Sequence, residues 1–358
     1  MFRPVVKAGH RNGIGIIGTG FGVATHHPAW SDIEGARVMG FAGRDAAHAS
    51  EVSHRFGLPI TGGTAEALLA SADVDIVVVA VPPGAQAPLI EAALESGKHV
   101  FAEKPLALDV GTASRLVEMA ERKGLRHGVN FCLRQARASL LLKQAMTEGR
   151  IGEPRRVVVT WHRGHRARKD LEWNWKCDAT QGGGVMNSHG VPILDLLMWL
   201  FADVLDGRCV RQINIPRRRD SSGRERDVTA EDALSATLSF VGGVTAVVSL
   251  DSTAVGGSGL SIDVFGSHGS LHMWQTAGPD PLSGLNVAIV DVQGRTETLL
   301  EDVDAKAEGQ VCLVKRLAHE FVKSVRERTP FSPDFSDGAR VISASGRLQF
   351  LAAPTSVL

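Results

Sequence analysis

The pattern of apolar and polar positions divides the chain into two parts. In the first part, short apolar runs alternate with segments whose apolar residues recur at the helical period. The apolar runs, which predict strands, are residues 14–17, 37–42, 74–81, 99–102 and 126–131. The helical segments between them are residues 46–56, 87–96 and 108–123. Strands that alternate with helices predict a parallel sheet.

In the second part most of the predicted elements are strands. The strand-like segments are residues 155–161, 233–240, 245–251, 261–265 and 287–292, and the helical ones are residues 309–328 and 336–351. Gly242 and Gly243 lie between two of these strands, and such a pair is typical of a hairpin turn. The arginine-rich residues 217–224 are expected to form a solvated hairpin tip.

Composition narrows the class of protein. With 358 residues the chain is long enough for about two domains. Lys+Arg and Asp+Glu both total 39, so no overall charge would attract nucleic acid or an anionic membrane. The longest apolar stretch, residues 193–202, is too short to span a bilayer, and residues 1–7 lack the apolar segment of a secretory signal. The four cysteines show no CxxC spacing, which argues against a disulfide framework or a zinc site and predicts a cytoplasmic protein.

A glycine-rich turn follows the first strand, and two registers of a dinucleotide-binding fingerprint overlap in it. Gly13-x-Gly15-x-x-Gly18 matches literally but lies inside the strand. Gly18-x-Gly20-x-x-Val23 follows the strand and opens a helical segment, which is the context that the mechanism requires. We take the second register, in which Gly18 forms the tight turn and Gly20 lets a pyrophosphate approach the backbone at a helix N-terminus. Val23, where a small residue is usual, predicts slightly wider packing of helix on strand.

The residues after the second strand bear on the choice of cofactor. An acidic residue at the strand tip would hydrogen-bond the ribose 2′-hydroxyl of NAD, and an arginine would accommodate the 2′-phosphate of NADP. Here the strand is followed by Gly43, Arg44 and Asp45. Because a guanidinium group pairs bidentately with phosphate, this order favours NADP. NAD remains an alternative cofactor, since Arg44 could do no more than stack on adenine, or Asp45 could reach the ribose.

Glu103-Lys104-Pro105 follows the strand predicted over residues 99–102. A lysine at the carboxyl end of a strand can reach a ligand that lies across the sheet. The proline restricts the backbone next to it. The chain has no tyrosine, so an acid–base role must fall to His, Lys, Asp, Glu, Cys or water.

These features together resemble the Gfo/Idh/MocA family, named after glucose–fructose oxidoreductase, inositol dehydrogenase and a rhizopine-catabolism protein. The segments that carry the resemblance cover nearly the whole chain and are residues 18–22, 77–83, 97–105, 182–184, 264–271 and 319–321. The Glu-Lys-Pro segment is the most specific of them.

The resemblance implies an α/β fold with two domains. Residues 1–131 would form an N-terminal Rossmann dinucleotide-binding domain. Residues 132–358 would form a C-terminal α/β domain with a large, open, mostly antiparallel sheet, which binds the substrate and packs on a partner subunit in a homo-oligomer, a dimer or tetramer. The cofactor-binding residues that it implies are Gly18, Thr19, Gly20, Phe21, Gly22, Gly43, Arg44, Ala80, Pro82, Pro83, Glu103 and Lys104.

The sequence departs from the family after the glycine triplet at residues 182–184. Catalytic members carry an Asp and a His one helical turn apart in this segment, and the His is usually taken as the general base. In register, Ser188 takes the place of the Asp and Pro192 that of the His. Gly190 and Asp195 match the family. Pro192 cannot donate a hydrogen bond to residue 188, so the helix is expected to kink or to start late with Pro192 in its first turn.

His189 is the histidine nearest in sequence to the vacated position, and it is our candidate for the general base because an imidazole titrates near neutral pH. The alternative is that His189 has no catalytic role and is simply a polar residue at the start of a helix. His162 and His165 are second candidates, with a solvated basic loop as the alternative. The candidate substrate residues are Lys104, Asn130, Arg134, Trp175, Lys176, Ser188, His189 and Asp195. Among them, Trp175 could stack on a sugar ring and Lys176 could pair with an anionic group of the substrate.

The sequence therefore predicts an NAD(P)-dependent oxidoreductase that transfers a hydride between nicotinamide and a polyol, sugar or related cyclic alcohol or ketone. Lys104 would stabilise charge on the substrate oxygen and His189 would exchange the proton. Because Ser188 and Pro192 replace the usual pair, two alternatives stay open. One is an NAD-retaining lyase or glycosidase with an internal redox cycle, and the other is a dinucleotide-binding sensor without catalysis. We expect no metal, nucleic acid or membrane partner.

Overall fold

The computed structural model describes residues 11–276, 280–302 and 308–351. Residues 1–7, which were used above to argue against a secretory signal, lie outside the described part of the chain. Within that part, no helix is both long enough and apolar enough to cross a membrane.

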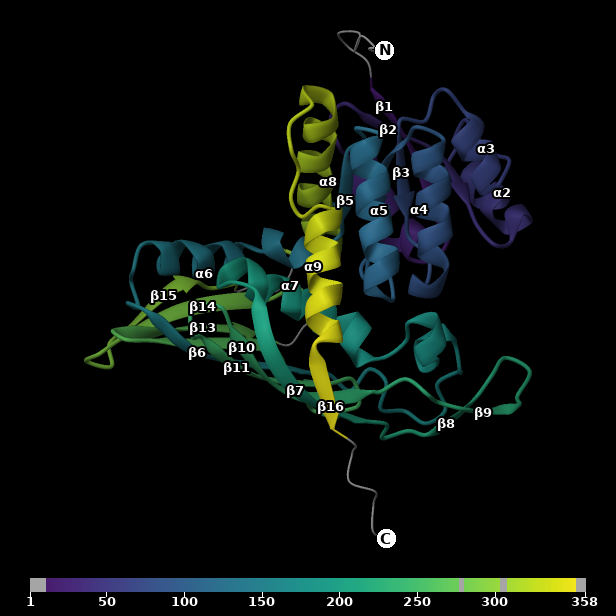
Figure 1. Ribbon diagram of the computed structural model, residues 1–358. Helices are drawn as coiled ribbons and strands as arrows, with labels where there is room; N and C mark the ends of the chain where they lie inside the picture. The colour runs from purple at the N-terminus through teal and green to yellow at the C-terminus, as the bar shows by residue number, and fades with distance from the viewer. Residues whose placement is uncertain (1–10, 277–279, 303–307, 352–358) are drawn as a thin grey trace. The chain divides into compact units, whose positions relative to one another are not determined.

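The chain forms two compact units (Figure 1). The first comprises Met1–Cys132 and Val311–Ile342, and the second comprises Leu133–Gln310 and Ser343–Leu358. This division differs from the single C-terminal domain expected for residues 132–358, because a late segment of the chain belongs to the first unit.

The first unit contains a five-stranded parallel sheet with the order β2-β1-β3-β4-β5. Its strands are β1 (Asn12–Ile17), β2 (Ala36–Ala42), β3 (Ile76–Val79), β4 (His99–Ala102) and β5 (His127–Val129). A parallel bridge between Gly40 and Ile60 extends the sheet beyond β2. The strand order reverses between β1 and β3, and ligands of such sheets bind at the carboxyl ends of the strands beside the reversal. The predicted parallel sheet and Rossmann-type fold are confirmed.

Side-chain caps fix where three helices of this unit begin. Its helical segments are η1 (Gly22–His26), α1 (His27–Ser31), α2 (Ala46–Arg55), α3 (Ala65–Ala70), η2 (Pro83–Ala85), α4 (Gln86–Glu95) and α5 (Val110–Arg122). Asp45, Thr64 and Asp109 accept hydrogen bonds from backbone N–H groups in the first turns of α2, α3 and α5. Helices α4 and α5 lie side by side against the sheet (Figure 1). The sequence did not predict α3, which has only six residues and so shows no clear period.

Helix α8 (Gln310–Glu327), predicted over residues 309–328, explains why a late segment joins the first unit. The ring centroid of Phe321 lies 5.4 Å from that of Phe101 in β4 and 6.4 Å from that of Trp30 in α1. All three side chains are fully buried. The apolar face of α8 is therefore part of the core that covers this sheet.

The second unit is built on a nine-stranded sheet with the order β15-β14-β13-β12-β6-β11-β10-β7-β16. Its strands are β6 (Pro154–His162), β7 (Val204–Gln212), β10 (Ala233–Phe240), β11 (Thr245–Asp251), β12 (Gly259–Gly266), β13 (Gly269–Gln275), β14 (Leu285–Asp291), β15 (Thr296–Leu300) and β16 (Leu348–Leu351). The pairs β6–β11 and β7–β16 are parallel, and the other described pairs are antiparallel. The mostly antiparallel sheet implied by the resemblance is confirmed.

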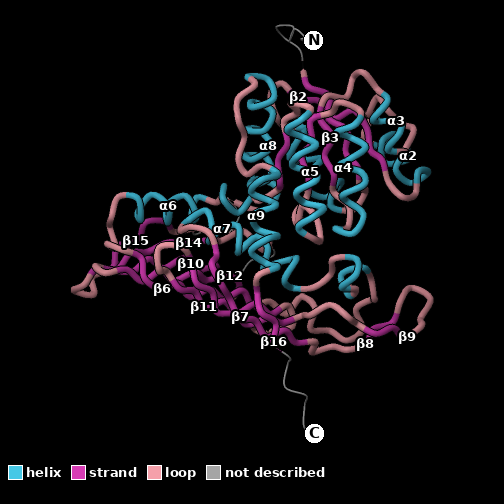
Figure 2. Tube along the Cα trace, viewed as in Figure 1, coloured by secondary structure: helices cyan, strands magenta, loops and turns pink. Residues whose placement is uncertain are grey.

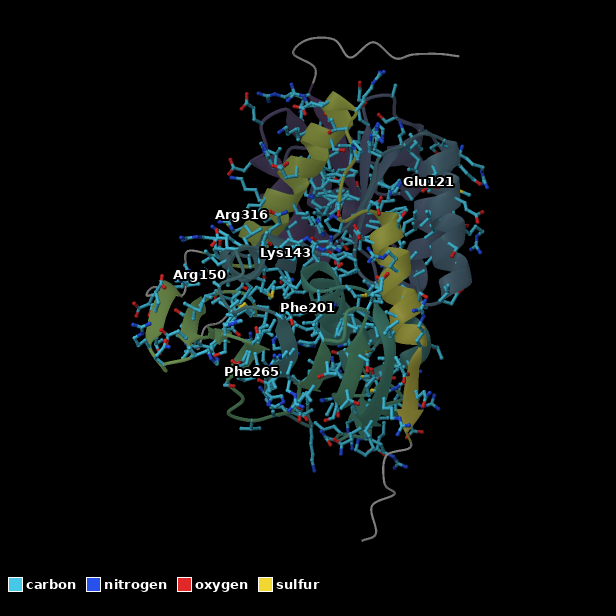
Figure 3. The ribbon with its side chains drawn as sticks, turned by 60° about the vertical axis from the view of Figure 1, so that its left-hand side comes forward. Glu121, Lys143, Arg150, Phe201, Phe265 and Arg316 are labelled. Carbon is cyan, nitrogen blue, oxygen red and sulfur yellow. The ribbon has the colours of Figure 1, made fainter. Side chains whose placement is uncertain are left out.

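Helices α6 (Arg137–Thr147) and α7 (Val191–Leu200) lie along one face of this sheet (Figure 2). Every residue of α7 except Trp199 is buried, and the ammonium group of Lys143 in α6 donates to the Trp199 carbonyl oxygen. On the other face, side chains at alternate strand positions are exposed. Figure 3 labels Lys143 on the helical side and Phe265 in β12. The exposed large apolar side chains of the central strands are Val247, Phe265 and Trp274.

The arginine-rich segment forms a hairpin of β8 (Arg217–Arg219) and β9 (Glu225–Asp227), as predicted. Its expected solvation is wrong at Arg218, which is 3% exposed. The Arg218 guanidinium donates to backbone carbonyl oxygens in the loop at residues 166–171. Hydrogen bonds to carbonyl groups compensate the burial of this charge.

The helix predicted over residues 336–351 ends early. Helix α9 (Phe335–Gly346) stops at a glycine, and the next residues form β16, parallel to β7. Leu348 of β16 fits against Gly207 of β7, where an added Cβ would come within 2.6 Å of the Leu348 side chain. The Leu348 side chain therefore packs over a glycine of the sheet. The helical period of the sequence did not predict this strand contact.

Candidate functional site

The turn after β1 is shaped by two glycines that have no room for a side chain. Gly18 has φ of 126°, and an added Cβ would lie 2.2 Å from the carbonyl oxygen of Ala80. At Gly22 an added Cβ would lie 2.9 Å from the side chain of Ile16. Nothing lies within 4 Å of a Cβ added to Gly20. The turn is therefore tightly packed on its inner side and open at Gly20, which fits the close approach of a pyrophosphate.

The tight helix–strand contact falls on a residue other than the one predicted. The segment after the turn opens as a wide π turn, η1, instead of an α-helix. This geometry turns Gly22 toward β1 and leaves Val23 partly exposed. The wider packing expected from Val23 is wrong, because Gly22 makes the contact.

The end of β2 lies beside this turn. An added Cβ on Gly43 would lie 3.2 Å from the Thr19 side chain, and Gly18 N–H donates to the Ala42 carbonyl oxygen. Arg44 is exposed and has no hydrogen bond or ion pair with any residue that the structure describes. Asp45 caps α2, since its Oδ1 accepts from the His48 N–H at 3.0 Å. Of the two charged residues here, the arginine is the one without a partner in the described part of the chain.

The remaining predicted cofactor residues of the first unit lie at the same edge of the sheet. Ala80 N–H donates to the Ile17 carbonyl oxygen, which joins the end of β3 to the end of β1. Pro82 and Pro83 follow and lead into η2. The ring of Phe21 in the glycine turn lies 5.4 Å from the ring of His26, edge to face.

A buried hydrogen-bond network lies behind Lys104, at the ends of β4 and β5. Glu103 Oε1 accepts from Asn130 Nδ2 at 2.6 Å and from His26 Nε2 at 2.8 Å. Trp30 Nε1 donates to His26 Nδ1 at 3.2 Å. This donation leaves the ring proton of His26 on Nε2, directed at Glu103. The sequence reasoning missed His26 and Trp30, although their spacing of four residues places them on one side of a helical turn.

The network keeps Glu103 ionised. Burial would raise the pKa of this carboxyl group, but the hydrogen bonds from His26 and Asn130 outweigh burial and hold the pKa below its usual value. The second carboxylate oxygen, Oε2, accepts from the backbone N–H of Lys104 at 3.2 Å. On the other side, Gln86 donates to the carbonyl oxygen of Pro105 at 2.8 Å. The backbone of Lys104 is thus held from both sides, while its side chain is partly exposed.

In the second unit the segment after the glycine triplet starts its helix late, which confirms the prediction from Pro192. Residues Met186–Gly190 form a π turn, η6, and α7 begins after it with Pro192 in the first turn. Glu231, which is 8% exposed, accepts from the Met186 N–H at 3.0 Å. Gly184 lies so close to this carboxylate that an added Cβ would be 2.6 Å from Oε1.

His189 lies at the end of this π turn and is 9% exposed. Its Nδ1 lies 2.9 Å from Ser188 Oγ, and Ser188 Oγ donates to the Gly184 carbonyl oxygen at 2.9 Å. A hydroxyl group has one proton. When that proton goes to Gly184, Nδ1–H of His189 donates to Ser188, and Nε2 is the basic nitrogen. The ring packs edge to face on Trp161 at 4.4 Å and lies 5.8 Å from the ring of His165.

Two neighbours of His189 bear on its surroundings, the buried Trp161 and the exposed His165. Trp161 is 5% exposed, and its Nε1 has no hydrogen-bond partner among the described residues. The pKa of His165 is lowered to about 4, first by partial burial of its ring, although the residue keeps exposed area, and then by the charges of Arg163, Arg166 and Lys176. His165 is therefore neutral at neutral pH. His162, by contrast, pairs through Nε2 with Ser249 at 2.9 Å.

Other predicted substrate residues have protein partners. Arg134 and Asp195, both buried, form a bidentate pair with Nε–Oδ2 and Nη2–Oδ1 distances of 2.8 and 2.5 Å. Asn130 donates to Glu103, and its Oδ1 has no partner within the described part of the chain. Lys176 Nζ lies 5.8 Å from the ring centroid of Trp175. Across the described ranges, no group of three or more His, Cys, Asp or Glu residues could hold a metal ion.

Two family models match the chain. One, described as an oxidoreductase family with an NAD-binding Rossmann fold (Gfo/Idh/MocA), matches residues 12–131, and the Gfo/Idh/MocA C-terminal domain matches residues 139–272. An uncharacterised oxidoreductase of Synechocystis sp. is 28% identical over 91% of this chain and 90% of its own length. A D-apiose dehydrogenase of Paraburkholderia graminis is 28% identical over 65% of this chain and 58% of its own length. The solved structure of levoglucosan dehydrogenase with NADH and L-sorbose shares the fold, with a TM-score of 0.83, 23% identity, and coverage of 95% of this chain and 98% of that one.

Proposed function

Because the chain belongs to the Gfo/Idh/MocA family of oxidoreductases, as its motifs predicted, we propose that it transfers a hydride between nicotinamide and a carbon of a sugar, polyol or related cyclic alcohol or ketone. The names of its relatives support this substrate class, since one acts on D-apiose and another was solved with NADH and L-sorbose. A nicotinamide cofactor, when bound, supplies or accepts the hydride. The residues of this chain bind the ligands, orient them and move the proton.

The observation that carries the proposal is the buried network behind Lys104. An ionised Glu103, held by His26 and Asn130, fixes the backbone of Lys104 at the carboxyl end of β4. The ammonium group of a lysine whose backbone is fixed in this way can donate to the substrate oxygen and stabilise the negative charge that develops on it. Asn130 then acts by positioning Glu103.

His189 is the group that we propose for proton exchange with the substrate hydroxyl. Its imidazole is nearly buried, hydrogen-bonded through Nδ1 to Ser188 and packed on Trp161. Such a ring can take a proton at Nε2 and release it later to water. Ser188 then acts by setting the tautomer.

For the cofactor we propose NADP over NAD. Gly18, Gly20 and Gly22 form a turn that fits a pyrophosphate, and Arg44 at the end of β2 has no partner among the described residues. Asp45 is the competing residue for a ribose contact, but its carboxylate caps α2. An exposed guanidinium group beside the turn suits a 2′-phosphate.

The open face of the nine-stranded sheet is the surface that we propose for a homo-oligomer. Val247, Phe265 and Trp274 expose apolar area on its central strands. Burial of such a face against a second copy is favourable in proportion to the area removed from water. Light scattering that returned one 38.1 kDa particle at micromolar concentration would contradict this. A cytoplasmic location is proposed from the scattered spacing of the four cysteines, which lacks a disulfide framework, and it predicts that the protein in cells carries no disulfide.

The test of the proposed function compares Lys104→Ala with the matched variant Lys323→Ala, which changes an exposed lysine of α8 in the same unit. We expect Lys104→Ala to lower kcat by ~10²-fold or more on any sugar or polyol that the protein oxidises, because an electrostatic stabiliser of the transition state is lost. Its affinity for NADP and NAD should stay within a few-fold of that of the unaltered protein. Lys323→Ala should change neither quantity. Equal activity of the two variants would remove Lys104 from the reaction.

A further inference from the structure

Four basic side chains of the second unit gather around the position of His165, a neighbour of His189, and we call them the basic cluster. They are Arg163, His165, Arg166 and Lys176. His165 is placed by its ring distance of 5.8 Å to His189. Lys176 is placed by its carbonyl oxygen, which accepts from Gly184 N–H, two residues before the π turn that carries His189. Arg166 Nη2 lies 3.1 Å from the sulfur of Cys177, the residue after Lys176.

The basic cluster has no carboxylate partner among the described residues, since none of its members forms an ion pair within 4.0 Å. The nearby acids are engaged elsewhere. Asp170 pairs with Arg168, and Asp178 accepts from Thr180. Asp251 accepts from the N–H and hydroxyl groups of Thr253. Positive charge in this loop is thus left without a carboxylate partner among the residues that the structure describes.

The charges of the basic cluster act on one another. The pKa of Lys176 is lowered first by burial and then by the charge of Arg166, although its side chain keeps exposed area. Three of the same charges help to lower the pKa of His165. Like charges at close range disfavour each other. An anion bound among them would relieve this repulsion.

The loop that carries the basic cluster is held in shape by other residues. Arg218 donates to the carbonyl oxygens of Arg166 and Arg168 at 2.6 Å each. Arg163 N–H donates to the carbonyl oxygen of Asp251 at the end of β11, at 2.8 Å. Because a buried arginine donates hydrogen bonds to its backbone carbonyl groups, the loop is ordered before any ligand binds. This order lowers the entropic cost of binding.

Trp161 adds an independent observation. Its indole Nε1–H is a donor only, it is buried, and it has no acceptor in the described part of the chain. The ring packs on His189. A buried donor without an acceptor is unfavourable, so an oxygen of a ligand or of a water molecule would satisfy it.

We propose that the substrate of this site is an anionic sugar or polyol, whose carboxylate or phosphate group binds to the basic cluster beside His189. The proposal rests on the proposed function for the redox step and adds the charge of the substrate. Lys176 and Arg166 bind the anionic group. The same contact orients the substrate and so determines which hydroxyl group is oxidised. A neutral sugar would leave the cluster uncompensated.

The test measures kcat/KM for D-glucose, D-glucuronate, D-gluconate and D-glucose 6-phosphate with both dinucleotides. We expect at least one of the three anions to exceed D-glucose by about ten- to hundredfold, the worth of a charge-assisted hydrogen bond. The two acids and the phosphate ester distinguish a carboxylate from a phosphate. Equal kcat/KM for D-glucose and all three anions overturns the proposal.

A pair of variants assigns the effect to the cluster. Lys176→Gln should lower kcat/KM for the preferred anion by about tenfold or more and leave D-glucose within about twofold. Lys176→Arg should restore most of the loss. The matched control is Lys169→Gln, an exposed lysine of the same loop outside the cluster, which should change neither value. Equal losses in Lys176→Gln and Lys169→Gln would contradict the assignment.

A binding measurement separates failure of this proposal from failure of the proposed function. Nuclear magnetic resonance of the His165 ring, with D-glucuronate and D-glucose 6-phosphate as probes, should show its pKa rising from about 4, because a bound anion favours the charged imidazole. A raised pKa without turnover of any sugar would support the anion site and refute the redox function. If the pKa of His165 stays unchanged, and the protein turns over D-glucose and the three anions equally well, the anion site is refuted and the redox function still stands.

Discussion

Two turns of this molecule share a design and differ in what surrounds their histidine. In each unit a glycine turn leads into a π turn, and a helix with proline in its first turn follows, α1 in the first unit and α7 in the second. Each π turn carries a buried histidine in contact with a tryptophan. His26 is hydrogen-bonded by Trp30, and His189 packs on Trp161.

The difference lies in the partners of the ring nitrogens. His26 accepts from an indole on one side and faces a carboxylate on the other, so its tautomer is fixed and it serves to orient Glu103. His189 has at Nδ1 the hydroxyl of Ser188, which sets its tautomer but, unlike the carboxylate at His26, carries no charge. The first arrangement suits a fixed support and the second suits a group that changes its protonation state. The same local backbone therefore supports positioning in one unit and, as we propose, proton exchange in the other.

The largest effect is expected when His189, the histidine of the second π turn, is removed. His189→Ala should lower kcat by ~10²-fold or more and remove from the rate profile a titration between pH 5 and 8, the range in which an imidazole changes charge. The matched control is His268→Ala, an exposed histidine of the same unit, which should keep the rate and the profile. Steady-state rates across this pH range decide the matter. Full activity of His189→Ala with an unchanged profile would transfer the role to His162 or His165.

The next largest effect concerns the first glycine turn and is measured as the preference for NADP over NAD. Arg44→Ala should weaken NADP binding by about tenfold or more and leave NAD within a few-fold, because one charge-assisted contact to a 2′-phosphate is lost. Calorimetric titration of both dinucleotides measures this ratio. Arg55→Ala, at the far end of α2, is the control. Equal weakening of NADP and NAD by Arg44→Ala would refute the 2′-phosphate contact.

The smallest effect concerns the fixed support itself. His26→Ala leaves Glu103 buried with one donor fewer, so we expect a loss of about 1–3 kcal/mol in the free energy of unfolding at neutral pH. The pKa of Glu103 is held low in the folded protein, so its contribution to stability is present above the unfolded pKa and lost as pH falls through the folded value.

In His26→Ala this acid-side loss should be smaller and should be complete at a higher pH, because the folded pKa of Glu103 rises toward that of the unfolded chain. Urea denaturation between pH 3 and 7 measures it, with His48→Ala, an exposed position of α2, as the control. Denaturation curves of His26→Ala and His48→Ala that depend on pH in the same way would show that His26 does not support the carboxylate.

Local patterns in the sequence predicted many of the regular elements, but α6, β7, β13 and β15 had no prediction. The strands at residues 99–102, 233–240 and 245–251 were predicted to the residue, since each is an apolar or alternating run bounded by turn residues. β7 was missed because charged residues at positions such as Arg208 and Arg211 mask its alternation. Helix α3 was too short for a period to appear.

Contacts between distant residues could not be predicted in this way. His26 and Glu103 are 77 positions apart, and Arg134 and Asp195 are 61 positions apart. Their pairing depends on which strand ends meet in the folded sheet and on how the helices pack. The π turns depend on similar contacts, such as that of Glu231 with the Met186 N–H. The sequence therefore singled out Glu103, Asn130 and Ser188 as site residues but did not show which contacts they make, and it gave no sign of His26 or Trp161.

The measurement that tests the central claim most directly is the stoichiometry of nicotinamide reduction. Purified protein is mixed with NADP or NAD and each sugar or polyol, and the absorbance at about 340 nm is compared with the amount of ketone or lactone formed. We predict one reduced nicotinamide per molecule of product, with the rate of formation of both lowered by ~10²-fold or more in Lys104→Ala. Conversion of a substrate with no net reduction would indicate an internal redox cycle, and dinucleotide binding without conversion of any substrate would indicate a sensor; either result contradicts a dehydrogenase.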